Sequence, residues 1–218
     1  MSDTQTTLQA IRDAFGSNQY PGDPYLQGSS DGCEPYEEIG PFQGKTDWQK
    51  LDAAFLDAHP AALSFFSEAG FRFFLPAYLV ADLQDQLKST NALFSLTGGF
   101  SDFHADTIVR DRRFAVKGGK SELINPRRYG AATSQDYARY RLAVFTREEA
   151  GAIAGYLRCK RDSDVYGIDQ AAITAALNEF WLERSKTAPT AAELEKHLNE
   201  KAAFVAALLD ANGTRQRS

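Results

Sequence analysis

Residues 63–87 read LSFFSEAGFRFFLPAYLVADLQDQL and contain the densest aromatic run of the chain, with five phenylalanines between positions 65 and 74. The apolar residues that follow are spaced by three and four, which places side chains on one face of a helix: Leu75, Tyr78, Leu79, Leu83 and Leu87. Ser67 is the predicted N-cap, and Glu68 in the first turn suits the positive end of the helix dipole. A segment this apolar must be covered by other elements, so we expect it to form the core.

Pro76 interrupts this predicted core helix. Because proline lacks an N–H group and its ring clashes with the carbonyl group of Arg72, it is expected either to kink one helix or to separate two. Outward from the core, amphipathic patterns predict helices over residues 3–15, from about 34 to 40, and from 47 to 58 with Asp47 as the cap. A long loop rich in proline, glycine and serine lies between the first two, over residues 17–33.

Helical patterns return in the last third of the chain. Thr146 with Glu149, and Thr190 with Glu193, have the spacing of capping boxes and mark two helix starts. Another helix is predicted over residues 168–184. The final helix carries an apolar stripe that includes His197 and ends at Asn212 and Gly213.

The pattern is weaker in the middle of the chain, from about residue 92 to 140. LFSLTGGF (93–100) is expected to be extended up to a Gly-Gly turn, and TIVRDRRFAVKGG (107–119) contains two short runs typical of strands. Either a small β-hairpin or an irregular basic excursion is consistent with this composition. The fold class is therefore mainly α, a single helical domain over 1–212 followed by a disordered basic tail at 213–218.

Length and composition limit the class of protein. With 218 residues, of which 43% are hydrophobic, the chain can bury a sizeable core without disulfides or structural metals. Its two cysteines are far apart, and the first residues lack the basic and apolar regions of a signal peptide. No apolar run reaches the ~18–20 residues that a membrane span needs. We expect a cytoplasmic protein with no membrane association.

The net charge of −5 is distributed unevenly along the chain. Residues 1–109 contain 5 Lys and Arg against 15 Asp and Glu, a net charge of −10, whereas residues 110–141 contain 9 against 3, a net charge of +6. A basic segment of this kind can bind an anionic partner. It can also fold back onto the acidic N-terminal half of its own chain, because charges of both signs are normally interspersed on soluble surfaces.

Several stretches together resemble a known family. They are Cys33 to Ile39 (CEPYEEI), Gly44-Lys45 with Trp48, FFSEAGFRFFLPAYL at 65–79 and FTREEAGAIAGYL at 145–157. The combination resembles a bacterial family catalogued only as a domain of unknown function, with FLPAYL as its most specific part. The similarity runs from about Phe15 to Trp181. Because that family has no assigned catalytic residues, the resemblance implies none for this chain.

The cluster that most resembles a metal site is Asp102, His104 and Asp106. Carboxylates and an imidazole suit Mn²⁺, Fe²⁺ or Zn²⁺, and alternate residues of an extended segment point to the same side. A polar turn whose aspartates bind nearby backbone N–H groups explains the same residues without a metal. We predict no cofactor, and a metal-dependent hydrolase that uses these three residues is the competing hypothesis.

The basic middle segment carries the strongest functional signal. It interleaves arginines and lysines with aromatic residues, and the predicted partner-binding residues are Arg110, Arg112, Arg113, Lys117, Arg127, Arg128 and Tyr129. Arginine with aromatics suits both nucleic-acid contacts and protein interfaces. A sequence pI of about 5.3 argues against a nucleic-acid partner for segment 110–141, because the rest of the molecule would repel a polyanion.

The sequence therefore predicts a non-enzymatic protein-binding module that acts through residues 100–141 and the loop 17–33. An immunity or antidote protein that neutralises a toxin is one concrete form of such a module. This prediction depends on a small, acidic chain that lacks a convincing catalytic constellation in its sequence.

Overall fold

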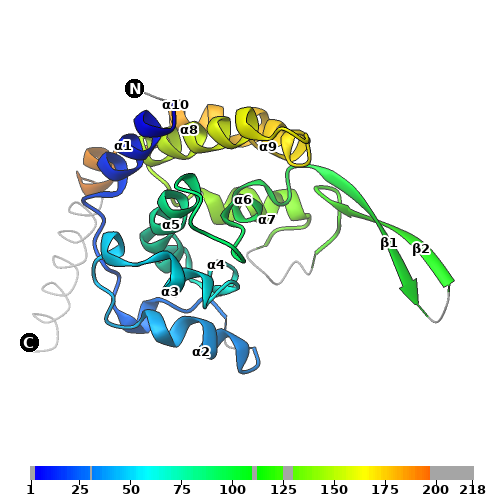
Figure 1. Ribbon diagram of the computed structural model, residues 1–218, viewed down its shortest axis with the longest axis horizontal. Helices are drawn as coiled ribbons and strands as arrows, with labels where there is room; N and C mark the ends of the chain where they lie inside the picture. Colours follow the sequence, from blue (N-terminus) through cyan, green and yellow to red (C-terminus); the bar gives the residue numbers. More distant parts are fainter. Residues whose placement is uncertain (1–2, 30, 110–111, 125–129, 197–218) are drawn as a thin grey trace, which may run out of the picture.

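The computed structural model describes residues 3–29, 31–109, 112–124 and 130–196, and it shows a mainly helical fold with one projecting β-hairpin (Figure 1). This confirms the predicted fold class. The elements are α1 (Asp3–Phe15), α2 (Glu34–Ile39), α3 (Ala53–Asp57), α4 (Ala62–Phe65), α5 (Glu68–Leu83), α6 (Ala92–Thr97), β1 (Asp102–Val109), β2 (Arg112–Gly119), α7 (Ser134–Leu142), α8 (Arg147–Ser163), α9 (Gln170–Ala176), a π-helical turn (Leu177–Trp181) and α10 (Leu182–Thr187), with short 3-10 turns at Asp23–Tyr25, Gly40–Phe42 and Trp48–Lys50.

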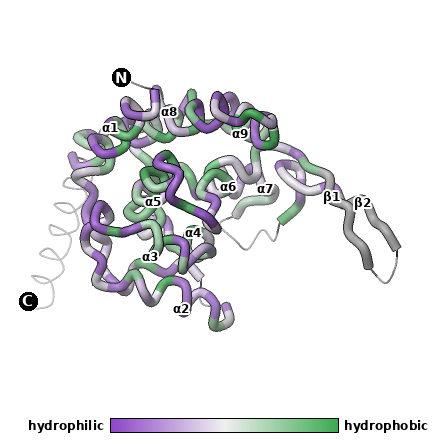
Figure 2. The backbone as a smooth tube through the Cα atoms, viewed as in Figure 1, coloured by the Kyte–Doolittle hydropathy of each residue, from purple (hydrophilic) through white to green (hydrophobic). Residues whose placement is uncertain are grey.

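Helix α5 is the core element that the sequence predicted. Ser67 caps it by accepting a hydrogen bond from the backbone N–H of Gly70 at 3.0 Å. Pro76 lies inside this single buried helix, so the predicted separation into two helices is wrong. The helices around it are amphipathic, and in Figure 2 α1 and α8 alternate between hydrophilic and hydrophobic residues along their length.

Aromatic side chains pack on both sides of α5. On one side the Phe42 ring lies 4.9 Å from that of Phe66 and 5.0 Å from that of Phe74, measured between ring centroids. On the other side the Phe145 ring lies 5.9 Å from that of Phe71 and 5.8 Å from that of Trp181. All five of these phenylalanines are at most 4% exposed, so the aromatic run at 65–74 joins elements from both halves of the chain.

Most of the predicted helix boundaries are confirmed. Helix α1 spans the predicted residues, and Thr146 with Glu149 forms a complete capping box at the start of α8. The helix predicted over 47–58 is wrong as a single element. Asp47 caps only the 3-10 turn Trp48–Lys50, and Asp52 then caps α3 by accepting from the N–H of Phe55 at 2.7 Å. Because the segment contains two capping residues, a 3-10 turn forms after the first and a separate helix, α3, begins after the second.

The middle of the chain contains two helices that the sequence analysis missed. Residues 92–97 form α6 rather than an extended segment, because Asn91 caps the helix by accepting from the N–H of Phe94. Helix α7 begins with a capping box between Thr133 and Asp136. Aspartate replaces the usual glutamate in that box, which is why the pattern was overlooked.

The hairpin was one of the two predicted alternatives and is confirmed. Strand β1 pairs antiparallel with β2 in a register from Asp102 opposite Gly119 to Val109 opposite Arg112. At the base, a Cβ atom on Gly118 would lie 2.5 Å from the Phe103 ring. Gly119 has φ +102°, and a Cβ there would lie 2.1 Å from the Ser101 carbonyl oxygen. At Gly119 the clash is with backbone atoms and φ is positive, so only glycine fits there. At Gly118 the clash is with the exposed Phe103 ring, which a side chain could displace.

The last predicted helix begins as expected, with the Thr190 hydroxyl accepting from the N–H of Glu193 at 3.1 Å. Its continuation, with His197 and the tail at 213–218, lies outside the described residues. Among the helices that are described, none has both the length and the apolar character to cross a membrane.

Two fully buried tyrosines provide a matched test of how polar groups are accommodated in this core. The Tyr78 hydroxyl has no hydrogen-bond partner among the described residues, whereas the Tyr156 hydroxyl donates to Asp82 at 2.5 Å. We expect Tyr78→Phe to change the free energy of unfolding by less than about 0.5 kcal/mol, and Tyr156→Phe to lower it by about 1–2 kcal/mol. Urea denaturation of both variants measures this difference, and equal losses would contradict it.

Candidate functional site

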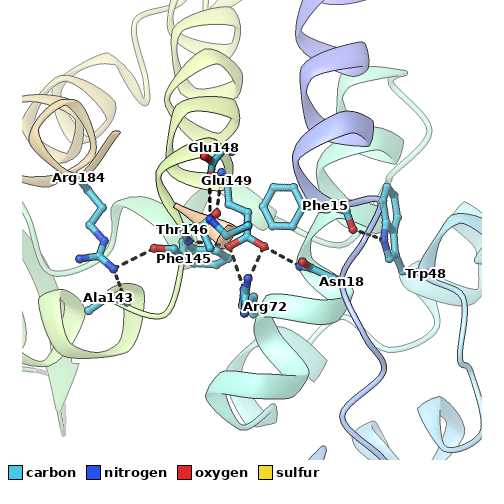
Figure 3. Close-up of polar contacts among 11 residues, drawn as sticks. Phe15, Asn18, Trp48, Arg72, Ala143, Phe145, Thr146, Glu148, Glu149 and Arg184 are labelled. Carbon is cyan, nitrogen blue, oxygen red and sulfur yellow. Dashed lines mark hydrogen bonds and ion pairs between the residues drawn. The ribbon is translucent and has the colours of Figure 1, made fainter. Parts of the chain in front are cut away.

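A buried ion pair lies at the junction of α5, α8 and the long N-terminal loop (Figure 3). Glu149 is completely buried, and the Nε atom of Arg72 lies 2.9 Å and 3.0 Å from its two carboxylate oxygens. The Asn18 side chain donates to the same carboxylate at 2.7 Å, and the Thr146 backbone N–H donates at 2.8 Å. Both carboxylate oxygens are therefore satisfied, as a buried charge requires.

This ion pair helps to hold the loop 17–33 against the helical body. Asn18 connects the start of the loop to α8, and further along the N–H of Gly28 donates to the carbonyl of Phe65 at 2.8 Å. The N–H of Ser67 donates to the carbonyl of Leu26 at 2.7 Å. The loop thus has a defined course along α4 and the start of α5.

A surface groove runs between this loop, α4, α6, α7 and the base of the hairpin. Two adjoining hollows of about 220 Å³ and 450 Å³ share Ser64, Tyr137 and Arg141 in their walls. We call these two hollows together the groove. The loop contributes Gly28 and Ser29. The groove therefore brings together parts of the two segments, 17–33 and 100–141, that the sequence analysis had proposed as one binding surface.

The larger hollow is apolar at its rim. Phe94 of α6 and Phe103 of β1 both line it, and they are 69% and 54% exposed. Its walls also include Ala138 and Leu142 from α7 and the small residue Gly98. Two large apolar side chains held in solvent at the rim of one concavity are typical of a binding surface.

Arg141 has a structural role in the wall of the groove. Its guanidinium group donates to the carbonyl of Leu63 and lies 4.5 Å from the centre of the Phe71 ring. These contacts fasten α7 to α4 and α5 through a carbonyl and an aromatic face. They also show how one basic residue of segment 110–141 contacts the N-terminal half of the chain.

The base of the hairpin is anchored to the π-helical turn. Glu179 in that turn accepts from the Lys120 ammonium group at 3.1 Å and from the Gln135 side chain, and its carbonyl accepts from Arg139 at 2.6 Å. Asp102 accepts from the backbone and side chain of Ser121 at 3.2 Å and 2.7 Å. Widened π turns often place side chains with a special role; here the turn presents one glutamate to three donors.

The predicted partner-binding residues fall mostly where their side chains are not described. Arg110, Arg127, Arg128 and Tyr129 lie outside the described residues. Arg112 and Arg113 lie on β2, opposite Val109 and Ile108, and only their backbone is described. Lys117 is described, and its ammonium group lies 3.3 Å from the Asp102 carboxylate within the hairpin. Their role in binding stays a prediction.

The predicted metal cluster lies on β1. The strand places Asp102, His104 and Asp106 at alternate positions, as expected, but only the backbone of the last two is described. The hydrogen bonds from Ser121, and to a lesser degree the Lys117 ammonium group, hold the pKa of Asp102 below its usual value. Among the described residues no group of three metal-ligating side chains comes together. The carboxylate of Asp102 is therefore occupied by protein donors.

Neither cysteine has a histidine as a hydrogen-bond partner among the residues that the structure describes. Cys159 is buried against Thr7, whose hydroxyl oxygen lies 3.2 Å from its sulfur. Burial is the main cause that raises the pKa of this thiol. A raised pKa disfavours the reactive thiolate. Cys33 is exposed at the start of α2.

The aromatic rim of the groove was missed by sequence reasoning. Phe94 was assigned to an extended run, and Phe103 was treated as a spacer between Asp102 and His104. Asn91 lies three residues before Phe94 and is a typical helix cap. Recognising this cap would have predicted α6 and would have placed Phe94 on a helix. No local pattern indicates that α6 and β1 face the same hollow, because that depends on packing.

The fold and the site define a mainly helical protein whose distinguishing surface is an open apolar groove at the base of a β-hairpin. The model of one family, described as a family of unknown function (DUF6714), matches residues 4–185, and the chain belongs to that family. The predicted resemblance to a domain of unknown function is thereby confirmed. Comparisons with curated proteins and with solved structures found no match.

The ion pair between Arg72 and Glu149 can be tested by removing one charge. We expect Glu149→Gln to lower the free energy of unfolding by about 2–3 kcal/mol. This loss is smaller than the ~3–5 kcal/mol expected when one partner of a fully buried ion pair is removed, because a quarter of the Arg72 side chain is exposed. Urea denaturation measures the loss, and the exposed neighbour Glu148→Gln is the control, expected to change stability by no more than about 0.5 kcal/mol.

A double variant separates charge from packing. Combining Glu149→Gln with Arg72→Met leaves no uncompensated buried charge. The double variant should therefore lose less stability than the two single variants lose in sum. Strictly additive losses would show that Arg72 and Glu149 do not stabilise each other.

Proposed function

We propose that this protein is a non-enzymatic protein-binding module whose groove receives apolar side chains of another protein. The observation that carries the proposal is the pair Phe94 and Phe103, both more than half exposed at the rim of one apolar hollow. Aromatic residues in a partly enclosed pocket are typical energetic centres of protein interfaces. Burying both rings in a complex would remove a large apolar area from water.

Charge indicates what kind of partner would fit. The segment 110–141 contributes Tyr137, Ala138 and Arg141 to the groove walls. The charged residues among the described lining are Glu68, Glu122 and Arg141, so the groove itself is nearly balanced in charge. A partner with an apolar anchor and few charges beside it would complement this surface. An antidote that neutralises a toxin in the cytoplasm is one concrete form of this proposal.

The arrangement at Asp102 is the reason that we do not propose a metal-dependent hydrolase. One of its carboxylate oxygens accepts from Ser121 twice, and the other lies beside the Lys117 ammonium group. A metal ion would have to displace these donors. For nucleic acid, the acidic balance of the chain as a whole argues against segment 110–141 as a polyanion-binding surface.

Site-specific cross-linking in the source cells tests the proposal. A photoreactive benzophenone amino acid at position 94 should form a covalent adduct with one defined protein, because the Phe94 ring would be buried in the complex. The control is the same amino acid at Tyr166, which is 87% exposed but does not line the groove. A shared adduct pattern at both positions would contradict the proposal.

Affinity for the protein identified by cross-linking provides the second measurement. Phe94→Ser should weaken binding at least about tenfold, as loss of an aromatic anchor does, whereas Tyr166→Ser should leave it unchanged. If purified partner binds both variants equally, or if position 94 captures only a small apolar molecule, the groove is not a protein-docking site.

A further inference from the structure

The turn between α8 and α9 presents three large apolar side chains to solvent. Val165, Tyr166 and Ile168 are 89%, 87% and 78% exposed. Single exposed apolar residues are common on proteins, whereas several that adjoin in one patch mark a contact with another surface. We call residues 164–169, which carry these three side chains, the tip.

The tip is held in a defined conformation by Asp164. The carboxylate of Asp164 accepts from the backbone N–H of Asp169 at 2.8 Å. Its carbonyl accepts from the N–H of Gly167 at 3.3 Å and from the side chain of Gln170 at 3.0 Å. A segment that is ordered before it meets a partner loses little conformational entropy on binding. The three exposed side chains therefore form a preformed convex surface.

A hollow of about 600 Å³ lies directly beside the tip, on the outer face of α9. It extends from Gly167 to Glu179, and the short side chains of Ala171, Thr174 and Ala175 form its middle. Ala171 and Thr174 are exposed, and in Figure 1 α9 lies at the upper edge of the body. We call this concavity the α9 hollow. A convex and a concave surface thus lie side by side on one face of the molecule.

The two ends of the α9 hollow differ in charge. At the tip, residues 161–169 contain 1 Arg against 3 Asp, a net charge of −2. At the other end, Glu179 binds the Lys120 ammonium group, and its carbonyl accepts from the exposed Arg139. The charges of these three side chains sum to +1. If two copies of α9 pack antiparallel, the acidic end of each lies opposite the basic end of the other.

We propose that the tip is a dimerisation element that inserts into the α9 hollow of a second copy of this chain. A two-fold axis across α9 places each tip in the hollow of the other copy, so both surfaces and both charged ends are matched at once. Such a contact is self-complementary, and the assembly closes at two subunits. This inference goes beyond the proposed function, because no residue of the tip or of the α9 hollow lines the groove.

Two exposed aliphatic residues provide a matched pair of variants. Ile168 lies in the tip, whereas Leu123, which is 82% exposed, belongs neither to the tip nor to the α9 hollow. We expect Ile168→Ser to raise the dimer dissociation constant at least about tenfold, because each dimer buries two copies of this side chain. Leu123→Ser should leave the dissociation constant within about twofold of the original.

The α9 hollow is tested from its own side by Ala171→Arg. The long, charged side chain would occupy the space that the tip needs, so the dissociation constant should again rise at least about tenfold. Arginine is a good helix former and position 171 is exposed, so α9 should remain folded. The control is Ala10→Arg at an exposed position of α1, which should change the constant by no more than about twofold.

Sedimentation equilibrium of the purified full-length chain measures these constants, with circular dichroism to confirm that helix content is unchanged. The parent protein should be a dimer that weakens as salt is raised, because part of the attraction is between opposite charges. A photoreactive benzophenone amino acid at position 166 of the purified chain should join two copies, with the adduct at residues 170–179 of the second copy.

A parent protein that stays monomeric at all accessible concentrations would overturn the proposal. Equal weakening by Ile168→Ser and Leu123→Ser would do the same, as would an adduct from position 166 that lies outside residues 170–179. Phe94→Ser should not alter the dimer, so failure of this test and failure of the groove proposal are distinguishable.

Discussion

The carboxylate of Glu149 is buried, charged and fully hydrogen-bonded, and three separate parts of the chain depend on it. Thr146 at the start of α8, Arg72 in α5 and Asn18 in the N-terminal loop all donate to it. A buried carboxylate is costly unless each of its oxygens has a partner, so the fold is favoured only when these three segments are in place together. The same residue that completes a local capping box also joins α8 to α5 and to the N-terminal loop.

This junction determines where the groove can form. Helix α5 is held against α8 by Arg72, and Asn18 holds the start of the loop 17–33 to α8. Backbone hydrogen bonds at Leu26 and Gly28 hold the loop against α4 and the start of α5. Arg141 holds α7 against α4 and α5 through its contacts with the Leu63 carbonyl and the Phe71 ring. The groove is the space that remains between these fixed walls, and the exposed rings of Phe94 and Phe103 stand at its rim. A surface with rigid walls and an apolar rim is well suited to binding without large rearrangement.

The hairpin of β1 and β2 and the groove meet at Phe103, which lies on β1 and lines the larger hollow. The groove is concave and is bounded by helices whose cores are already packed, so it is stable without an occupant. The hairpin is a two-stranded ribbon that projects from the body. The anchoring of its base to Glu179 limits the directions in which it can extend.

The sequence alone determined the central helix, its cap at Ser67, the capping boxes of the last third and the mainly helical class, because these depend on residues within a few positions of each other. It also limited the middle of the chain to two alternatives, of which the hairpin is correct. Errors arose where two capping residues competed, at Asp47 and Asp52, and where the cap at Asn91 that begins the short helix α6 was not recognised. Only the tertiary structure decided that Asn18, Arg72 and Glu149 would meet and that Phe94 and Phe103 would share one rim. These are contacts between residues far apart in sequence, and the free energy that forms them comes from packing the whole core rather than from any local pattern.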